Sequence, residues 1–263
     1  MTSVKSTTAL RMRVFAGPNG SGKSTIIQAV RDYKIKSIPL DFGIYINADD
    51  IVQLLLKNKF NFTDYSITTT NDEFKHIVLH SGLINIDFTE QKFISGYVLK
   101  NNKIKLTDTS IVEQFAQLLA DFLRKKLLAE KKKFSFETVF SHPSKLDIMQ
   151  EAKDAGYKVY LYFVSTESPE INKGRVILRE KKGGHNVPPD KIESRYYRSL
   201  DLLYKASQLS YQTFFFDNSE TGKDFKLFAR FKIVDGKKHW SNIKQDDFPE
   251  WFKKYYLNKN RKQ

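Results

Sequence analysis

Apolar runs of strand length alternate with amphipathic stretches of helical period along most of this chain. Residues 12–16 form an apolar run that precedes a helical pattern at about 23–32, and residues 43–46 precede a helix that carries Ile51. Further strands are expected at 134–136, 158–164 and 213–216, and further helices at 111–127, 144–155, 169–180 and 190–208. Because strands that alternate with helices pair in parallel, the pattern predicts an α/β fold with a doubly wound parallel sheet and helices on both faces.

Two segments break this alternation. Residues 58–107 are rich in Asn, Thr, Phe and Ile, and two apolar runs flank Asn101-Asn102 as the strands of a hairpin would. Residues 221–263 contain a second hairpin pattern followed by an aromatic helical face. We therefore expect a core of residues 1–220 that contains an inserted segment at 58–107, with the C-terminal hairpin and helix packed on that core.

A glycine-rich segment lies between the first strand and the first helix and fits the motif G-x-x-x-x-G-K-[ST]. In such a P-loop the glycines let backbone N–H groups curl round a polyphosphate, and the helix N-terminus adds a positive dipole. The lysine reaches the β- and γ-phosphates, and the hydroxyl after it can ligate Mg²⁺. We expect the loop to bind ATP or GTP with Mg²⁺, with Ser24 as metal ligand, through Gly17, Pro18, Asn19, Gly20, Ser21, Gly22, Lys23, Ser24 and Thr25.

Acidic side chains follow the second strand, where open α/β sheets bind their ligands. Asp49 and Asp50 begin the next helix, shortly after Asn47. Phosphoryl transfer to an alcohol needs a carboxylate near the acceptor, and we expect Asp49 to orient and deprotonate the acceptor hydroxyl. Asp50 could be the active carboxylate instead, or one of the two could cap the helix. Asn47 and Asp50 are expected on the substrate side.

A third carboxylate, Glu137, ends the strand at 134–136. It can hold Mg²⁺ through water, as a Walker B acid does, or bind a substrate hydroxyl, and Thr138 and Ser141 can add hydrogen bonds. The alternative is an acid at a helix N-terminus with a capping hydroxyl nearby. We expect Glu137 to be catalytic and Thr138 and Ser141 to contact the substrate.

Two arginines four residues apart, Arg175 and Arg179, share one face of a helix that leads into Gly183-Gly184-His185. Cations on a helix that ends in a glycine hinge are typical of a lid that closes over phosphates. A basic helix face that is only solvated is the alternative. We expect both arginines to neutralise charge on the transferred group and His185 to lie on the substrate side.

The composition of the chain excludes some kinds of chemical site. The chain has 263 residues, a formal charge of +14, no cysteine, and five histidines in which we find no paired metal-ligand spacing. Disulfides and thiol chemistry are excluded, and any metal should be the Mg²⁺ of the nucleotide. No apolar run approaches the roughly 20 residues that span a bilayer, and the N-terminus lacks the apolar core of a signal peptide, so a cytoplasmic protein without a membrane partner is expected.

Several short motifs occur in one order along the chain: G-P-N-G-S-G-K-S-T, I-N-A-D-D-I, F-E-T-V-F-S, G-R-V-I-L-R-E-K-K-G-G-H-N-V-P and F-D-N-S. In this order they resemble the zeta-toxin family of P-loop kinases, particularly its branch with a G-G-H-x-V-P lid, over roughly residues 10–57 and 110–220. The resemblance implies an ATP-dependent kinase that phosphorylates a nucleotide sugar, typically UDP-N-acetylglucosamine. It also implies a toxin–antitoxin setting, often with a small neutralising protein.

The resemblance also implies roles for single residues. Lys23 and Ser24 correspond to the phosphate and Mg²⁺ residues, Asp49 to the base and Glu137 to the acid on the substrate side. Arg175 and Arg179 resemble the lid arginines. His185 stands where some members carry a second catalytic arginine, so the acceptor of this branch can differ.

The charge of +14 supports an alternative function, that of a polynucleotide kinase or a nucleic-acid-dependent ATPase. No helicase or RNA-recognition motif accompanies the charge, so nucleic acid is not the favoured partner. A third possibility is a regulatory module that only binds a nucleotide, but such a module would need neither Asp49 nor Glu137.

Overall fold

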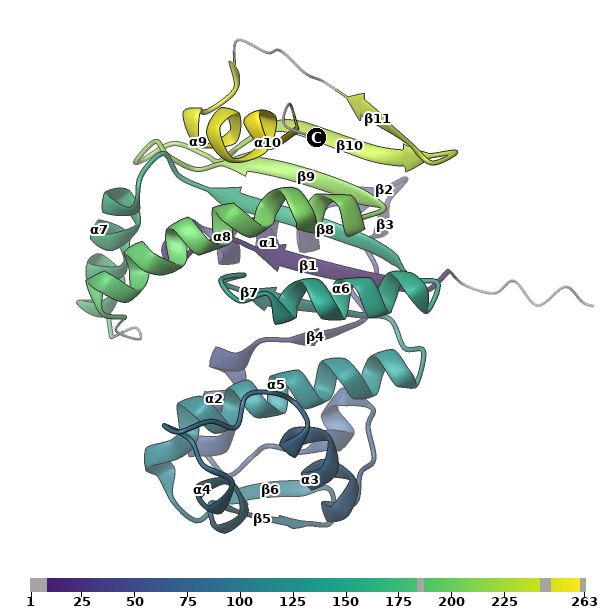
Figure 1. Cartoon of the computed structure of the whole chain (residues 1–263), viewed down its shortest axis with the longest axis vertical. Coiled ribbons are helices and arrows are strands. Elements are labelled where there is room, and N and C mark those ends of the chain that lie inside the picture. The colour runs from purple at the N-terminus through teal and green to yellow at the C-terminus, as the bar shows by residue number, and fades with distance from the viewer. Residues whose placement is uncertain (1–8, 184–186, 242–246, 261–263) are drawn as a thin grey trace, which may run out of the picture. The chain divides into compact units, whose positions relative to one another are not determined.

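The computed structural model describes residues 9–183, 187–241 and 247–260 (Figure 1). Contacts within the chain divide it into two compact units, each of which is described by itself. Residues 1–42 together with Glu137–Gln263 form the first unit, and Gly43–Phe136 forms the second. One strand, β7 (Phe134–Thr138), begins in the second unit and ends in the first.

The first unit is built on a mostly parallel sheet. In it β8 pairs in parallel with β1 and with β9. Beyond β9 the sheet continues with β10, which pairs antiparallel with β9, and with β11, which pairs antiparallel with β10. The strands are β1 (Arg11–Ala16), β8 (Lys158–Ser165), β9 (Gln212–Asp217), β10 (Lys226–Val234) and β11 (Lys237–Ser241). Nearly every residue of β1 and β8 is buried, as expected for interior strands with helices on both faces.

Helices cover both faces of this sheet, since Figure 1 draws α6 and α8 in front of the strands and α1 behind them. The helices of this part are α1 (Lys23–Asp32), α6 (Ser144–Asp154), α7 (Pro169–Glu180) and α8 (Pro189–Leu209). A short separate hairpin, β2 (Lys34–Ile35) with β3 (Ile38–Pro39), follows α1. Parallel strands joined by helices confirm the predicted α/β fold.

An aromatic cluster attaches the C-terminal segment to the first unit. Trp251, Phe252 and Tyr256 are at most 2% exposed. Their rings contact Phe215 of β9 and Phe228 of β10. The segment comprises α9 (Glu250–Phe252), a π-helical turn (Lys253–Leu257) and α10 (Asn258–Asn260). The aromatic face expected near the C-terminus is thus largely buried within its own unit.

The second unit has a helical pair beside a short parallel strand pair. Its strand β4 pairs in parallel with the first residues of β7, and its helices α2 and α5 pack along each other. The elements are β4 (Ile44–Ile46), α2 (Ala48–Leu56), the 3₁₀ turns Phe62–Tyr65 and Thr109–Ile111, α3 (Asn71–Leu79), α4 (Glu90–Ser95), β5 (Tyr97–Lys100), β6 (Lys103–Leu106) and α5 (Val112–Ala129). The hairpin expected around Asn101-Asn102 is β5–β6.

Phenylalanine side chains fill the core of this second unit. Phe74 of α3 is fully buried and its ring contacts Phe62, Phe93, Phe115 and Phe122. The apolar stripe predicted at 111–127 is buried throughout, at Ile111, Phe115, Leu118, Leu119, Phe122, Leu123 and Leu127. The unit extends beyond the expected insertion at 58–107 because α2 and α5 pack with the segment between them.

Candidate active site

The P-loop forms a tight turn between β1 and α1. Gly22 has φ 97°, a left-handed conformation that side chains other than glycine rarely adopt. A Cβ added at Gly17 would lie 2.1 Å from the carbonyl oxygen of Val164, and one added at Gly22 would lie 2.2 Å from Nδ2 of Asn218. Glycine is therefore favoured at both positions: at Gly17 the backbone of β8 lies too close for a side chain, and at Gly22 the backbone conformation is left-handed.

Lys23 is the first residue of α1 and its side chain is only 8% exposed. Its Nζ donates a hydrogen bond to the carbonyl oxygen of Pro18 at 3.0 Å and lies 3.8 Å from Oε1 of Glu137. The ammonium group therefore lies across the P-loop, next to an acid from the end of β7. The lysine at this position of a P-loop motif is the one that reaches phosphates, and here its charge lies beside a carboxylate from outside the loop.

The residues around the loop fit a bound polyphosphate. No side chain among the described residues caps α1, and Ser24 and Thr25 lie exposed in its first turn. Oγ of Ser21 is buried without a hydrogen-bond partner in the described part of the chain, and a hydroxyl can donate to a phosphate oxygen. An anion at this helix N-terminus would satisfy backbone N–H groups and would face the positive end of the helix dipole.

The segment after Glu137 is held in a compact turn. Oγ1 of Thr138 accepts a hydrogen bond from the backbone N–H of Phe140 at 3.1 Å. Phe140 is fully buried and has φ 60°. The Thr138 hydroxyl thus has a local partner in its own turn, and Ser141 follows as a half-buried residue.

The acidic residues expected at the second strand lie in the second unit, in the first turn of α2. Oδ1 of Asn47 accepts a hydrogen bond from the backbone N–H of Asp49 at 3.0 Å, so Asn47 is the N-cap of this helix. Asp49 and Asp50 are exposed. The charge of Asp50 acts on Tyr65, whose pKa is raised to about 12 mainly by burial and further by this carboxylate.

The two arginines of α7 differ in their surroundings. Nη1 of Arg175 donates to the carbonyl oxygen of Asn218 at 2.7 Å, and Nη2 donates to that of Glu220 at 3.5 Å. Burial lowers the pKa of Arg175 from its usual value, and the Asp217 carboxylate opposes this shift. Arg179 is exposed one turn further along the helix. His185 lies outside the described residues.

The segment after β9 has contacts that our sequence analysis missed. Nδ2 of Asn218 donates to the carbonyl oxygen of Ser21 in the P-loop at 2.9 Å. Oδ1 of Asp217 accepts a hydrogen bond from Nε1 of Trp251 at 2.8 Å. The sequence F-D-N-S, whose residues had no expected role, was the available signal. It lies at the carboxyl end of a strand, the edge where α/β sheets bind ligands.

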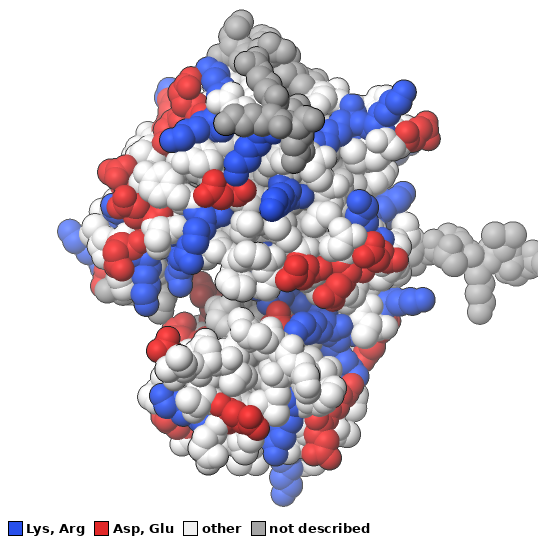
Figure 2. Space-filling model, in the orientation of Figure 1, with Lys and Arg blue, Asp and Glu red and all other residues white. Residues whose placement is uncertain are grey.

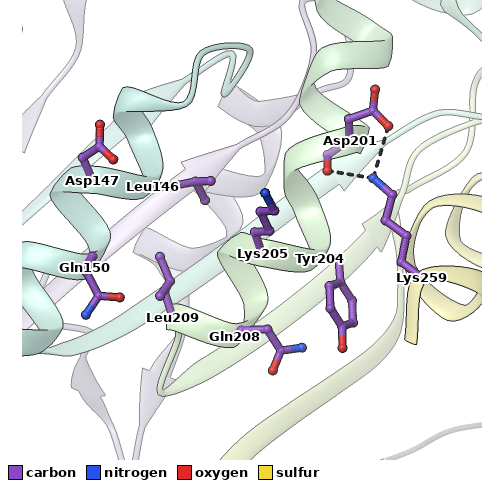
Figure 3. A pocket seen from close by; sticks show the side chains of 9 residues that line it. All are labelled: Leu146, Asp147, Gln150, Asp201, Tyr204, Lys205, Gln208, Leu209 and Lys259. Carbon is purple, nitrogen blue, oxygen red and sulfur yellow. Dashed lines mark hydrogen bonds and ion pairs between the residues drawn. The ribbon is translucent and has the colours of Figure 1, made fainter. Parts of the chain in front are cut away.

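A cavity of about 750 Å³ lies elsewhere in the first unit, where α6 and α8 approach each other (Figure 3). Its wall is largely apolar, with Leu146 from α6 and Tyr204 and Leu209 from α8. Nζ of Lys259 lies 3.2 Å from Oδ1 of Asp201 at its edge. No residue of the P-loop lines this cavity, and neither does Glu137.

A comparison with family models finds a match that covers more than half of the chain. The family model described as zeta toxin matches residues 67–221. The chain belongs to the zeta-toxin family. The match contains Glu137, Arg175 and Arg179, whereas the P-loop and Asp49 precede it. It also includes residues 67–107, which we had expected to lie outside the resemblance.

Solved structures share the fold of this zeta-toxin family member. A structure from the PezAT chromosomal toxin–antitoxin system of Streptococcus pneumoniae has a TM-score of 0.50 and 14% sequence identity, over 96% of this chain and 80% of that chain. A structure of AvrRxo1-ORF1:AvrRxo1-ORF2 with sulphate ions has a TM-score of 0.50 and 17% identity, over 89% of this chain and 61% of that chain. At these identities the likeness concerns the fold.

A curated relative is an uncharacterized protein of Haemophilus influenzae, which is 35% identical over 63 residues, or 24% of this chain. The matched stretch spans 45% of that relative's length. Among the described helices of the zeta-toxin chain, none is both long enough and apolar enough to cross a bilayer. The described residues also contain no cluster of three His, Cys, Asp or Glu side chains able to hold a metal ion.

Proposed function

We propose that the protein is an ATP-dependent kinase that transfers the γ-phosphoryl group to a hydroxyl of a small molecule, with a nucleotide sugar of the UDP-N-acetylglucosamine type as first candidate. The observation that carries the proposal is the position of Lys23. Its buried Nζ lies across the P-loop, 3.8 Å from Glu137. Membership of the zeta-toxin family supports the same reaction class.

On the donor side, Lys23 exchanges its bond to the Pro18 carbonyl for the β- and γ-phosphates. The Ser24 hydroxyl, exposed in the first turn of α1, would hold Mg²⁺ with the nucleotide, and Glu137 would hold the ion through water. When bound, MgATP supplies the phosphoryl group. Arg175 and Arg179 neutralise the charge that develops on that group. Arg175 suits this role because its bond to Asn218 anchors it to a residue that contacts the P-loop.

On the acceptor side, we assign the base to Asp49. Its carboxylate accepts the proton of the acceptor hydroxyl as that oxygen bonds to the γ-phosphorus and ADP leaves. Asp50, Thr138 and Ser141 are proposed substrate contacts, and so is His185. Asn47, also predicted on the substrate side, supports Asp49 as the N-cap of α2.

We also propose that the kinase acts as a cytoplasmic toxin that a small antitoxin protein neutralises. The solved structure from the PezAT toxin–antitoxin system supports this setting, because it shares the fold of this chain. Growth arrest on induced expression, relieved by Asp49→Asn, would connect the chemistry to toxicity.

A purified-enzyme assay tests the kinase directly. The protein is incubated with ATP, Mg²⁺ and a panel of nucleotide sugars, and products are separated by mass. We expect one sugar nucleotide to gain a phosphoryl group with wild type and none with Lys23→Ala. A protein that phosphorylates no small molecule but labels RNA or DNA ends would replace this proposal with the polynucleotide kinase.

The charge of +14 is the observation that favours that second candidate. On the face drawn in Figure 2, however, Lys and Arg are interspersed with Asp and Glu and form no continuous basic track. No helicase or RNA-recognition motif accompanies the charge, so nucleic acid stays the second choice. Its signature would be ATP turnover that RNA or DNA ends stimulate and that falls steeply with salt.

A further inference from the structure

Asn218 follows β9 directly and its side chain contacts the P-loop. Its Nδ2 donates to the carbonyl oxygen of Ser21 at 2.9 Å, although the two residues are 197 positions apart in the chain. The same nitrogen would be 2.2 Å from a Cβ at Gly22. The amide group therefore fills the space beside Gly22, the residue immediately before Lys23.

The backbone of Asn218 is held from two sides. Its N–H donates to the carbonyl oxygen of Ser165 at the end of β8, at 2.9 Å, and its carbonyl oxygen accepts from Nη1 of Arg175 at 2.7 Å. The neighbouring Asp217 accepts hydrogen bonds from Oγ of Ser219 at 2.7 Å and from the indole of Trp251. A side chain carried by so constrained a segment has a defined position before any ligand arrives.

The hydrogen bond to Ser21 has a consequence for the next N–H group. A peptide unit is planar and trans, so its C=O and N–H point in opposite directions. Because the Ser21 carbonyl points to Asn218, the N–H of Gly22 points away from Asn218. Backbone N–H groups of this part of a P-loop are the donors that surround phosphate.

We propose that Asn218 is a positioning residue of the phosphate site, which acts by holding the Ser21 carbonyl so that the Gly22 N–H faces the bound phosphates. This inference rests on the proposed nucleotide-binding function. An amide donor is required at the position. A carboxylate would set an acceptor against the Ser21 carbonyl, and an alanine would leave that carbonyl without its partner.

The test measures binding of MgATP and of magnesium tripolyphosphate by calorimetry. The proteins are wild type, Asn218→Asp, Asn218→Ala and the control Asn258→Asp, which adds the same charge at an exposed site. We expect both Asn218 variants to bind both probes about tenfold more weakly, the effect of losing one orienting hydrogen bond. The two probes should lose affinity by the same factor because they share only phosphates. Asn258→Asp should bind like wild type.

The melting temperature of each unliganded protein separates positioning from folding. We expect the uncharged variant Asn218→Ala to melt within a few degrees of wild type while its phosphate affinity falls. Unchanged affinity for tripolyphosphate in either folded variant would overturn the inference, as would a loss seen with ATP alone, which would indicate a contact to the nucleoside. Wild type that binds neither probe would overturn the proposed function itself.

Discussion

Three side chains from different elements meet at the P-loop of the first unit. Lys23 belongs to α1, Glu137 to the end of β7 and Asn218 to the segment after β9. The lysine and the acid are 3.8 Å apart, and the asparagine holds a loop carbonyl at 2.9 Å. Lys23 and Glu137 thus set the charge at the loop, whereas Asn218 sets the direction of a loop carbonyl. Substitutions at these residues can therefore test the two effects one at a time.

At the residue scale, the two neighbouring carboxylates of α2 provide a matched pair. Asp49→Asn should lower kcat by at least about 10²-fold because it removes the proposed general base. Asp50→Asn, one position further in the same helical turn, should lower it much less. Phosphotransfer rates at saturating ATP measure both effects, and ATP binding should be unchanged in each variant. Equal losses in the two variants, or a larger loss for Asp50→Asn, would contradict the assignment of the base.

At the element scale, the phenylalanine core stabilises the second unit. Phe74 of α3 is fully buried and contacts several rings, so Phe74→Ala should reduce the free energy of unfolding by about 3–5 kcal/mol. Urea titration followed by circular dichroism measures the change. The control is Ile86→Ala in the same unit, where a side chain that is 94% exposed should change stability by no more than about 0.5 kcal/mol. A loss below about 1 kcal/mol for Phe74→Ala would contradict this account of the core.

Trp251 of α9 is joined to β9 through an indole hydrogen bond and to the sheet through aromatic packing. Trp251→Phe retains much of the packing but removes the donor to Asp217 at 2.8 Å. We expect the free energy of unfolding to fall by about 1–3 kcal/mol, because the carboxylate loses a partner in a half-buried position. Trp240→Phe, at a residue that is 37% exposed, should cost less in the same urea titration. The reverse order would show that the indole bond contributes little.

The local pattern of apolar residues predicted most helices and strands of the first unit and the long helix α5 of the second. The strand before the P-loop, the helix after it and the stripe buried on α5 all follow from apolar spacing within a few turns. The helices α3 and α4 were not predicted, because they are short and depend on packing around Phe74.

The candidate site was predictable where a motif is contiguous and not where contacts are distant. The nine residues of the P-loop are recognised from one contiguous motif. The hydrogen bond between Asn218 and Ser21 joins positions 197 apart, so no local pattern predicts it. Arg175 was predicted as a lid cation, and its hydrogen bond to the Asn218 carbonyl could not be read from helical spacing. Asn47 was expected to bind substrate, and its N-cap bond to Asp49 depends on where α2 begins.

At the scale of the whole molecule, we propose that this zeta-toxin family member is a kinase of a small metabolite. The most direct measurement is mass spectrometry of cell metabolites after induced expression of wild type and of Asp49→Asn. We expect one metabolite, a sugar nucleotide or a related alcohol, to accumulate with an added phosphoryl group in cells with wild type only. Identical metabolite profiles at equal levels of the two folded proteins would contradict the proposal.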